Sequence, residues 1–259
     1  MNWFHRWRRK RILERHLIPH AAFTTTVADL PILQGLSPEE QARLREQASL
    51  LIHDKAFSAA GGADVNETIQ HLIALQACLL TLNLSEDSYH GWSEIILYPD
   101  EFLRQHEEMD EAGVVHHSRD ILTGESWHGG PLVLSIADVV ASGKADGFNV
   151  VLHEFSHKLD MLNGDANGFP PLHRDMDAAS WAHDFNSAYE NLCRRVDAGE
   201  DTAIDPYATA NPAEFFAVLT EVFFETPHIL HMEYPAVYRQ LQRFYRQHPL
   251  GRLKAHAHA

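Results

Sequence analysis

The chain has 259 residues, of which 45% are hydrophobic, so it is long enough and apolar enough to bury a substantial core. Lys and Arg number 21 against 36 Asp and Glu, a formal net charge of −15 that disfavours general binding to nucleic acid. Two cysteines are too few for a disulfide framework, and no apolar run approaches the ~18 residues of a membrane-spanning helix. These features exclude a disordered or membrane-spanning chain and favour a globular protein of the reducing cytoplasm.

The first 16 residues form a basic segment that contrasts with the rest of the chain. They contain six Arg or Lys residues and one Glu, a charge of 6 − 1 = +5, which leaves 15 − 35 = −20 for the remainder. No apolar segment with a cleavage site follows, so this is not a secretory signal. We interpret residues 1–16 as a basic arm, either simply solvated or directed at an acidic partner or an anionic membrane surface. Residues 17–250 are expected to form a single domain, and residues 251–259 a short His-containing tail.

The expected secondary structure is mainly helical, with a small sheet in the middle of the chain. Ser37 before Pro38 predicts a helix that runs to about residue 52. Helical spacing of apolar residues predicts other helices at 69–80, 148–162, 176–196, 211–225 and 234–247. Short β-rich runs predict strands at 95–98, 113–117 and 131–134. The predicted fold class is therefore α+β, with the sheet beside the helix at 148–162.

Residues 153–157, His-Glu-Phe-Ser-His, form an H-E-x-x-H motif in an apolar predicted helix. Histidines four residues apart lie on one helical face, so His153 and His157 can bind one metal ion. Glu154 can then accept a proton from a metal-bound water that attacks a peptide carbonyl. The chain contains 19 histidines, so a chance pair of core or surface histidines is the alternative. The apolar helical setting favours the metal site.

A catalytic zinc ion normally has three protein ligands, so another residue must complete the site. Glu214 lies 57 residues beyond His157 and follows Asn211 at the start of a predicted helix. The same spacing suits a capping-box-like role for Glu214. Glu221 and Glu225 share its helical face and can bind a metal or support the metal ligands. The spacing alone does not choose among the three glutamates.

A series of segments resembles the Mlc titration factor A family of zinc metallopeptidases over most of the chain. The matching segments are 95–99, 113–116, 124–127, 130–134, 153–160, 163–165, 205–208 and 212–214. The resemblance implies a zincin-like peptidase domain that binds one Zn²⁺ per chain through His153, His157 and Glu214, with Glu154 as the catalytic base. It also associates His116 with the metal, as a ligand that would fill the position needed by water or substrate.

Roles are also expected for two further residues, Tyr207 and Asp160. The family looks like a relative of the anthrax lethal factor catalytic domain, which implies that Tyr207 stabilises the oxyanion. From the residues alone, Tyr207 is equally well a loop aromatic that packs on the following helix. Asp160 lies three residues beyond His157, where its carboxylate can accept the outer N–H of a ligand histidine or cap a neighbouring helix.

The resemblance implies peptide hydrolysis with an aminopeptidase preference, and an extended peptide substrate can add along the predicted strand at 131–135. It also implies a second class of function, an interaction protein that binds Mlc, a transcriptional repressor of sugar-uptake genes, and removes it from DNA. The acidic surface suits a partner with a basic DNA-binding face. A third interpretation is an iron site, since two histidines and a carboxylate also form a facial triad. Glu154 has a clear task in hydrolysis and none evident in oxygen activation, which disfavours iron.

Overall fold

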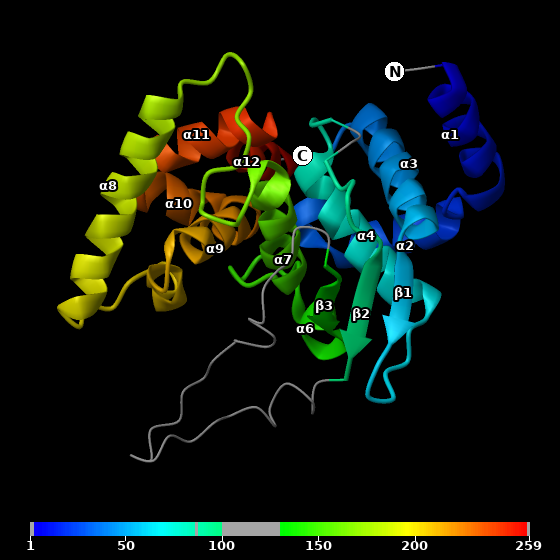
Figure 1. Cartoon of the computed structure of the whole chain (residues 1–259), viewed down its shortest axis with the longest axis horizontal. Coiled ribbons are helices and arrows are strands. Elements are labelled where there is room, and N and C mark those ends of the chain that lie inside the picture. The colour runs from blue at the N-terminus through cyan, green and yellow to red at the C-terminus, as the bar shows by residue number, and fades with distance from the viewer. Residues whose placement is uncertain (1–2, 86–87, 100–129, 258–259) are drawn as a thin grey trace.

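A computed structural model describes residues 3–85, 88–99 and 130–257 (Figure 1). Its helices are α1 (Trp3–His16), α2 (His20–Asp29), α3 (Pro38–Asp54), α4 (Glu67–Thr81), α6 (Ile136–Ala141), α7 (Val150–Asp160), α8 (Ala178–Asp197), α9 (Pro212–Glu225), α10 (Pro227–Glu233), α11 (Pro235–Tyr245) and α12 (Pro249–Ala257). Its strands are β1 (Ala56–Ala59), β2 (Glu94–Tyr98) and β3 (Leu132–Ser135). Three short 3₁₀ helices are η1 (Pro31–Leu33), η2 (Met161–Asn163) and η3 (Pro206–Thr209). The α+β fold class is confirmed.

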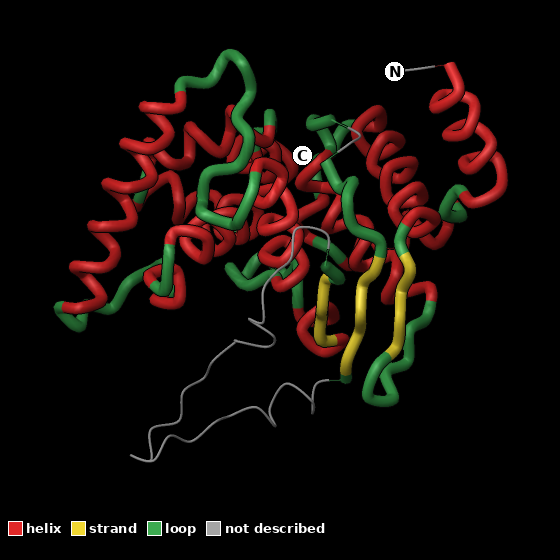
Figure 2. The backbone as a smooth tube through the Cα atoms, viewed as in Figure 1, coloured by secondary structure: helices red, strands yellow, loops and turns green. Residues whose placement is uncertain are grey.

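The three strands form one parallel sheet in the order β1-β2-β3, at one side of a mainly helical molecule (Figure 2). The sequence predicted β2 and β3, in which alternate residues such as Ile95 and Leu97 are buried. It missed β1, because these four residues show no buried position and only half-buried Phe57 and Ser58. The predicted strand at 113–117 lies outside the described residues.

All six predicted helices are confirmed within a few residues, and the caps that the sequence predicted at Ser37 and Asn211 are present. Ser37 forms a capping box with Glu40 at the start of α3. Asn149 caps α7 by accepting from Leu152 N, and Asn211 caps α9 by accepting from Ala213 N and Glu214 N. The two caps fix where the motif helix and the downstream glutamate helix begin.

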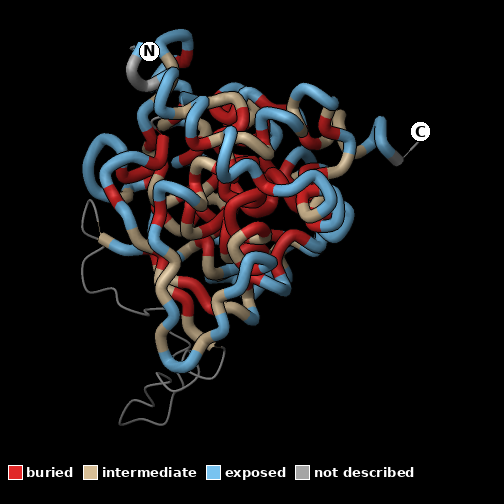
Figure 3. The backbone as a smooth tube through the Cα atoms, turned by 90° about the vertical axis from the view of Figure 1, so that its right-hand side faces the viewer, coloured by how far each residue is buried: buried red, intermediate tan, exposed pale blue. Residues whose placement is uncertain are grey.

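Helices α7 and α9 pack together in the middle of the molecule, with α4 on another side of α7 (Figure 1). The buried parts of the chain gather in the interior of the molecule (Figure 3). On α9, Phe215, Phe216, Phe223 and Phe224 are almost fully buried. Trp181 of α8 stacks on Phe185 at 4.2 Å between ring centroids and contacts the Phe216 ring. This aromatic core anchors α9, so its polar face is presented to α7 in a fixed position.

A glycine allows the loop after α7 to approach the first turn of α9. Gly168 has φ +76, and a Cβ there would lie 2.4 Å from the Pro212 carbonyl oxygen. The N–H groups of Asn167 and Gly168 donate to Asp160 Oδ2 at 2.8 and 2.7 Å. The loop therefore ties the end of α7 to the turn of α9 that carries Glu214.

The basic residues of the predicted arm lie on α1, which packs against α3. Arg8 pairs with Asp54 at 3.0 Å, and Arg9 pairs with Glu46 at 2.7 Å. At the other end of the chain, Arg252 of α12 donates to carbonyl oxygens near η1. The division into arm, domain and tail stays a prediction. Across the described ranges, no helix combines the length and apolarity required to cross a membrane.

Candidate metal centre

Helix α7 places both motif histidines on one face. The imidazole rings of His153 and His157 have centroids 4.9 Å apart, and their Nε2 atoms are separated by 3.3 Å. Both side chains are largely buried, with 7% and 12% of their surface exposed. Two Nε2 atoms at this distance can bind the same ion, as the helical spacing predicts.

Glu214 completes this cluster from the first turn of α9. Its Oε2 atom lies 2.9 Å from His153 Nε2, and its Oε1 atom lies 3.5 Å from His157 Nε2. Asn211 caps α9, so the Glu214 side chain bonds to the histidines while only its backbone N–H takes part in the cap. Among the three glutamates that the spacing left open, the structure brings Glu214 to the place where the Nε2 atoms meet.

The cluster fits a metal ion by its donor chemistry and its spacing. Within the part of the chain that the structure describes, His153, His157 and Glu214 are the one group of three such residues with donor atoms within 4.8 Å of one another. Tetrahedral coordination with bonds of about 2.0–2.1 Å separates neighbouring ligand atoms by about 3.3 Å. The observed separations of 2.9, 3.3 and 3.5 Å bracket that value. Two imidazoles and a carboxylate suit zinc, and this donor set also occurs in iron sites.

Glu221 contacts His153 on the side of its ring that faces away from Glu214 and His157. Its Oε1 atom accepts a hydrogen bond from His153 Nδ1 at 2.8 Å, while its Oε2 atom accepts from the backbone N–H of Asn149 at 2.5 Å. Only 3% of Glu221 is exposed. With Nδ1 bonded to this carboxylate, Nε2 of His153 faces Glu214 and His157 and is the ring nitrogen that a metal ion would bind. The helical spacing left the role of Glu221 open, and in the structure its carboxylate orients the ring of His153.

A wider polar network fixes the N-terminal end of α7. The side-chain amide of Asn149 donates to Glu225 Oε1 and to Gln76 Oε1, both at 2.7 Å. The second Glu225 oxygen accepts from Ala145 N at 2.6 Å. Burial raises the pKa of Glu225 to about 7 although these donors oppose the rise. Glu225 thus joins α9 to α7 without contacting either motif histidine.

The cluster favours a positive charge at its centre. Burial works against a charged imidazole, yet hydrogen bonds to Glu214 and Glu221 raise the pKa of His153 to about 10. Burial also disfavours the charged form of Glu214 and by itself would raise its pKa. Hydrogen bonds from both histidines outweigh burial and hold that pKa well below its usual value. Two carboxylates therefore face the imidazole pair from two sides, an environment that attracts a metal cation.

Asp160 has a different set of contacts from the one expected. Its Oδ2 atom accepts the two loop N–H groups after α7, and burial raises its pKa. Among the described residues, Asp160 Oδ1 and His157 Nδ1 are both buried without a hydrogen-bond partner. The expected bond between them is thus not formed, although His157 acts electrostatically on the pKa of Asp160. Support of His157 by Asp160 stays a prediction.

Tyr207 and Glu154 lie close to the cluster. Tyr207 belongs to η3, where Asp205 Oδ1 accepts its backbone N–H. Its ring centroid lies 6.1 Å from that of His153. Glu154 is half-buried on α7 and acts electrostatically on both His153 and Lys158. His116 lies outside the described residues. The catalytic roles of Tyr207 and Glu154 and the metal role of His116 stay predictions.

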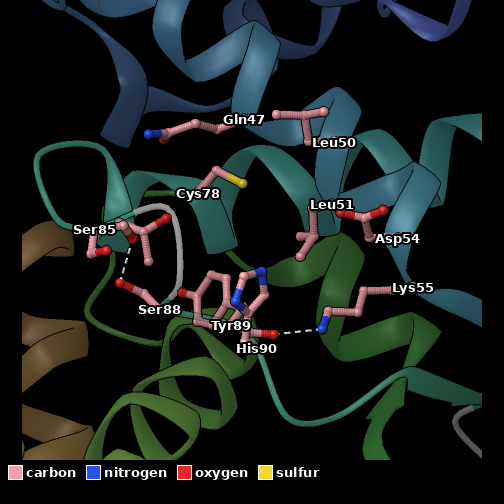
Figure 4. A pocket seen from close by; sticks show the side chains of 11 residues that line it. Gln47, Leu50, Leu51, Asp54, Lys55, Cys78, Ser85, Ser88, Tyr89 and His90 are labelled. Carbon is pink, nitrogen blue, oxygen red and sulfur yellow. Dashed lines mark hydrogen bonds between the residues drawn. The ribbon is translucent and has the colours of Figure 1, made fainter. Parts of the chain in front are cut away.

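A separate cavity of about 90 Å³ lies between α3, α4 and the turn at residues 88–90 (Figure 4). Cys78 and Tyr89 line it, and the ammonium group of Lys55 donates to the carbonyl oxygens of Tyr89 and Trp92. Burial raises the pKa of the Cys78 thiol, which keeps it protonated and weakly nucleophilic. The cavity contains none of the three metal-binding candidates and offers no activated nucleophile from Cys78.

The fold and the cluster define a class, an α+β protein with a histidine–histidine–glutamate cluster that could hold a metal ion and whose two histidines come from one buried helix. The chain belongs to the family described as glucose-regulated metallo-peptidase M90, whose profile matches residues 4–246.

Curated relatives agree with this assignment and with the resemblance seen in the sequence. Mlc titration factor A of Yersinia pestis (strain Pestoides F) is 40% identical over 229 residues, which cover 87% of this chain and 84% of the relative. The protein of the same name from Yersinia pseudotuberculosis serotype O:3 (strain YPIII) has the same identity and coverage. The similarity to anthrax lethal factor stays a prediction.

We expect Glu221→Gln to weaken zinc binding about 10- to 100-fold, because a neutral amide cannot accept from both His153 Nδ1 and Asn149 N. Competition with a chromophoric chelator measures the affinity. Glu190→Gln, at an exposed position of α8, is the matched control and should bind zinc like the wild type. Equal affinities for all three proteins would show that Glu221 does not support the ligand.

We expect Glu225→Gln to change the pH dependence of stability. The folded-state pKa of Glu225 is raised to about 7 from 4.5, so its contribution to stability is fully present below pH 4.5 and is lost as the pH rises through 7. The glutamine imitates the protonated carboxyl group and does not titrate. The free energy of unfolding of the variant, relative to that of the wild type, should therefore rise by on the order of 2 kcal/mol between pH 5 and pH 8. Urea denaturation at both pH values measures this gain, and a constant difference would contradict it.

Proposed function

We propose that the chain is a zinc-dependent peptidase of the cytoplasm that uses Glu154 as its general base. The observation that carries the proposal is the convergence of His153, His157 and Glu214 on one point, in a chain of a metallo-peptidase family. A bound zinc ion would polarise a peptide carbonyl and lower the pKa of a bound water. Glu154 follows His153 directly on α7, so its carboxylate is available to take the proton of that water and to pass it to the leaving amine.

Tyr207 is proposed to stabilise the oxyanion that develops on the scissile carbonyl. The proximity of its ring to His153 supports this, since a phenol O–H at that distance from a metal ligand can reach a substrate oxygen. His116 is proposed to approach the metal when no substrate is bound. It would then occupy the position that water or substrate requires, and it would have to leave before hydrolysis.

The substrate is proposed to be an extended peptide that lies along β3. Among the described strands, β3 is at one edge of the sheet, and it contacts α7. Lys158 of α7 donates to the Gly130 carbonyl oxygen at 2.9 Å, which fixes the chain just before β3 beside the motif helix. An added strand would run close to the proposed general base. An aminopeptidase preference is part of the proposal and rests on the family resemblance.

A second candidate function is binding to a transcriptional repressor. Its support is the name of the relatives, Mlc titration factor A, at 40% identity over 87% of this chain. The net charge of −15 would speed encounter with a partner that carries a basic DNA-binding face. Repressor binding and peptidase activity are compatible on one molecule, because the proposed catalytic groups occupy only a small buried region.

We expect Glu154→Gln to lower peptide hydrolysis by about 10²- to 10⁴-fold and to leave zinc content unchanged, because the variant loses the proton acceptor and keeps the ligands. Aminoacyl chromogenic substrates and their N-acetylated analogues measure the rate and test the aminopeptidase preference. The control is Glu190→Gln, which removes an exposed carboxylate from α8.

Wild-type activity in the Glu154 variant would contradict the proposed general base. Repressor binding by the same variant, measured by displacement of the repressor from its operator DNA, separates the two candidate functions. Unchanged binding with lost hydrolysis would show that repressor binding does not require the Glu154 carboxylate.

A further inference from the structure

The outward face of α1 combines exposed tryptophans with cations. Trp3 and Trp7 are 76% and 46% exposed, and at 100° per residue they lie on the same side of the helix. Lys10 follows on that side, and the Arg11 guanidinium lies 5.3 Å from the centroid of the Trp7 ring. Ile12, on the opposite side, is buried. The two large indoles are therefore directed away from the protein core.

The inward face fixes the orientation of the helix. Ion pairs of Arg8 with Asp54 and of Arg9 with Glu46 attach α1 to α3. They involve two of the six cations of α1, and Glu14, the one acidic residue of the helix, lies 3.9 Å from Lys10 in an exposed pair. Arg6, Lys10, Arg11 and Arg15 are exposed. The outward face is thus both cationic and aromatic, and its direction is set by the contacts on its other side.

Charge complementarity points to an anionic partner, and the indoles indicate which kind. An indole lies readily at the headgroup level of a bilayer because it has an apolar body and a hydrogen-bonding N–H, and cations beside it can meet lipid phosphates. We propose that the outward face of α1 binds peripherally to an anionic phospholipid surface. The lipid phosphates would contact Arg6, Lys10 and Arg11, and Trp3 and Trp7 would enter the interface.

The acidic remainder of the chain is compatible with this orientation. Residues outside the first 16 carry a formal charge of 15 − 35 = −20. A helix is about 10–12 Å across, and the Debye length at physiological salt is about 8 Å. With α1 between the bilayer and the body, most acidic groups lie beyond one Debye length. In Figure 1, α1 lies at the edge of the molecule beyond α3, so the body need not approach the lipid.

Co-sedimentation of the full chain with vesicles tests the proposal. We expect binding to phosphatidylcholine vesicles that contain about 30% phosphatidylglycerol, little binding to pure phosphatidylcholine, and loss of binding at high salt. Arg6→Gln/Lys10→Gln/Arg11→Gln and Trp3→Ser/Trp7→Ser should each weaken partition into anionic vesicles by about tenfold or more. Circular dichroism and thermal melting establish that both variants are folded.

The matched controls remove similar groups from other surfaces. Arg174→Gln/Arg194→Gln/Arg239→Gln removes three exposed cations, and Met232→Ser removes a side chain that is 70% exposed on α10. Neither control should change partition. No binding to anionic vesicles at low salt would overturn the proposal. So would equal losses in the controls, or binding of the helix face to duplex DNA or an acidic protein in place of vesicles.

Discussion

The packing of α7 against α9 is the contact on which the candidate site depends. The two helices are far apart in sequence, and buried hydrogen bonds tie them together. Glu221 of α9 bonds at once to the ring of His153 and to the backbone at the start of α7. The same helix delivers Glu214 to the other side of that ring. A shift of one turn, about 5.4 Å, between the helices would separate Glu214 from both Nε2 atoms.

Three carboxylates on α9 make three different sets of contacts because they lie opposite different positions along the axis of α7. Glu214 meets the outer ring nitrogens, Glu221 holds the inner nitrogen of His153, and Glu225 holds the cap residue Asn149. Burying several carboxylates is unfavourable unless each has donors or a cation nearby. The donors belong to α7 and to the loop before it. The polar face of α9 and the N-terminal half of α7 therefore require each other.

Much of this arrangement can be predicted from the sequence, and the rest depends on how helices cross. The four-residue spacing of His153 and His157 and the cap at Asn211 are local patterns, and both are confirmed as structural features. The choice among the α9 glutamates is not local: residues 214, 221 and 225 share a face, and only the crossing with α7 decides which one reaches the histidines. The contacts of Asp160 are not local either, because its Oδ2 atom accepts a hydrogen bond from a loop that folds back at Gly168.

X-ray absorption at the zinc edge of the metal-loaded protein tests whether His153, His157 and Glu214 bind the metal. We expect one zinc ion per chain with the imidazoles of His153 and His157 and a carboxylate oxygen at about 2.0–2.1 Å, joined by a third imidazole if His116 approaches the metal as proposed, and one imidazole fewer in His157→Ala. A third imidazole that is present in the wild type and absent from His116→Ala would identify His116 as the proposed additional ligand. A sulfur ligand, or a spectrum that does not change on removal of His157, would contradict the assignment of the metal to this cluster.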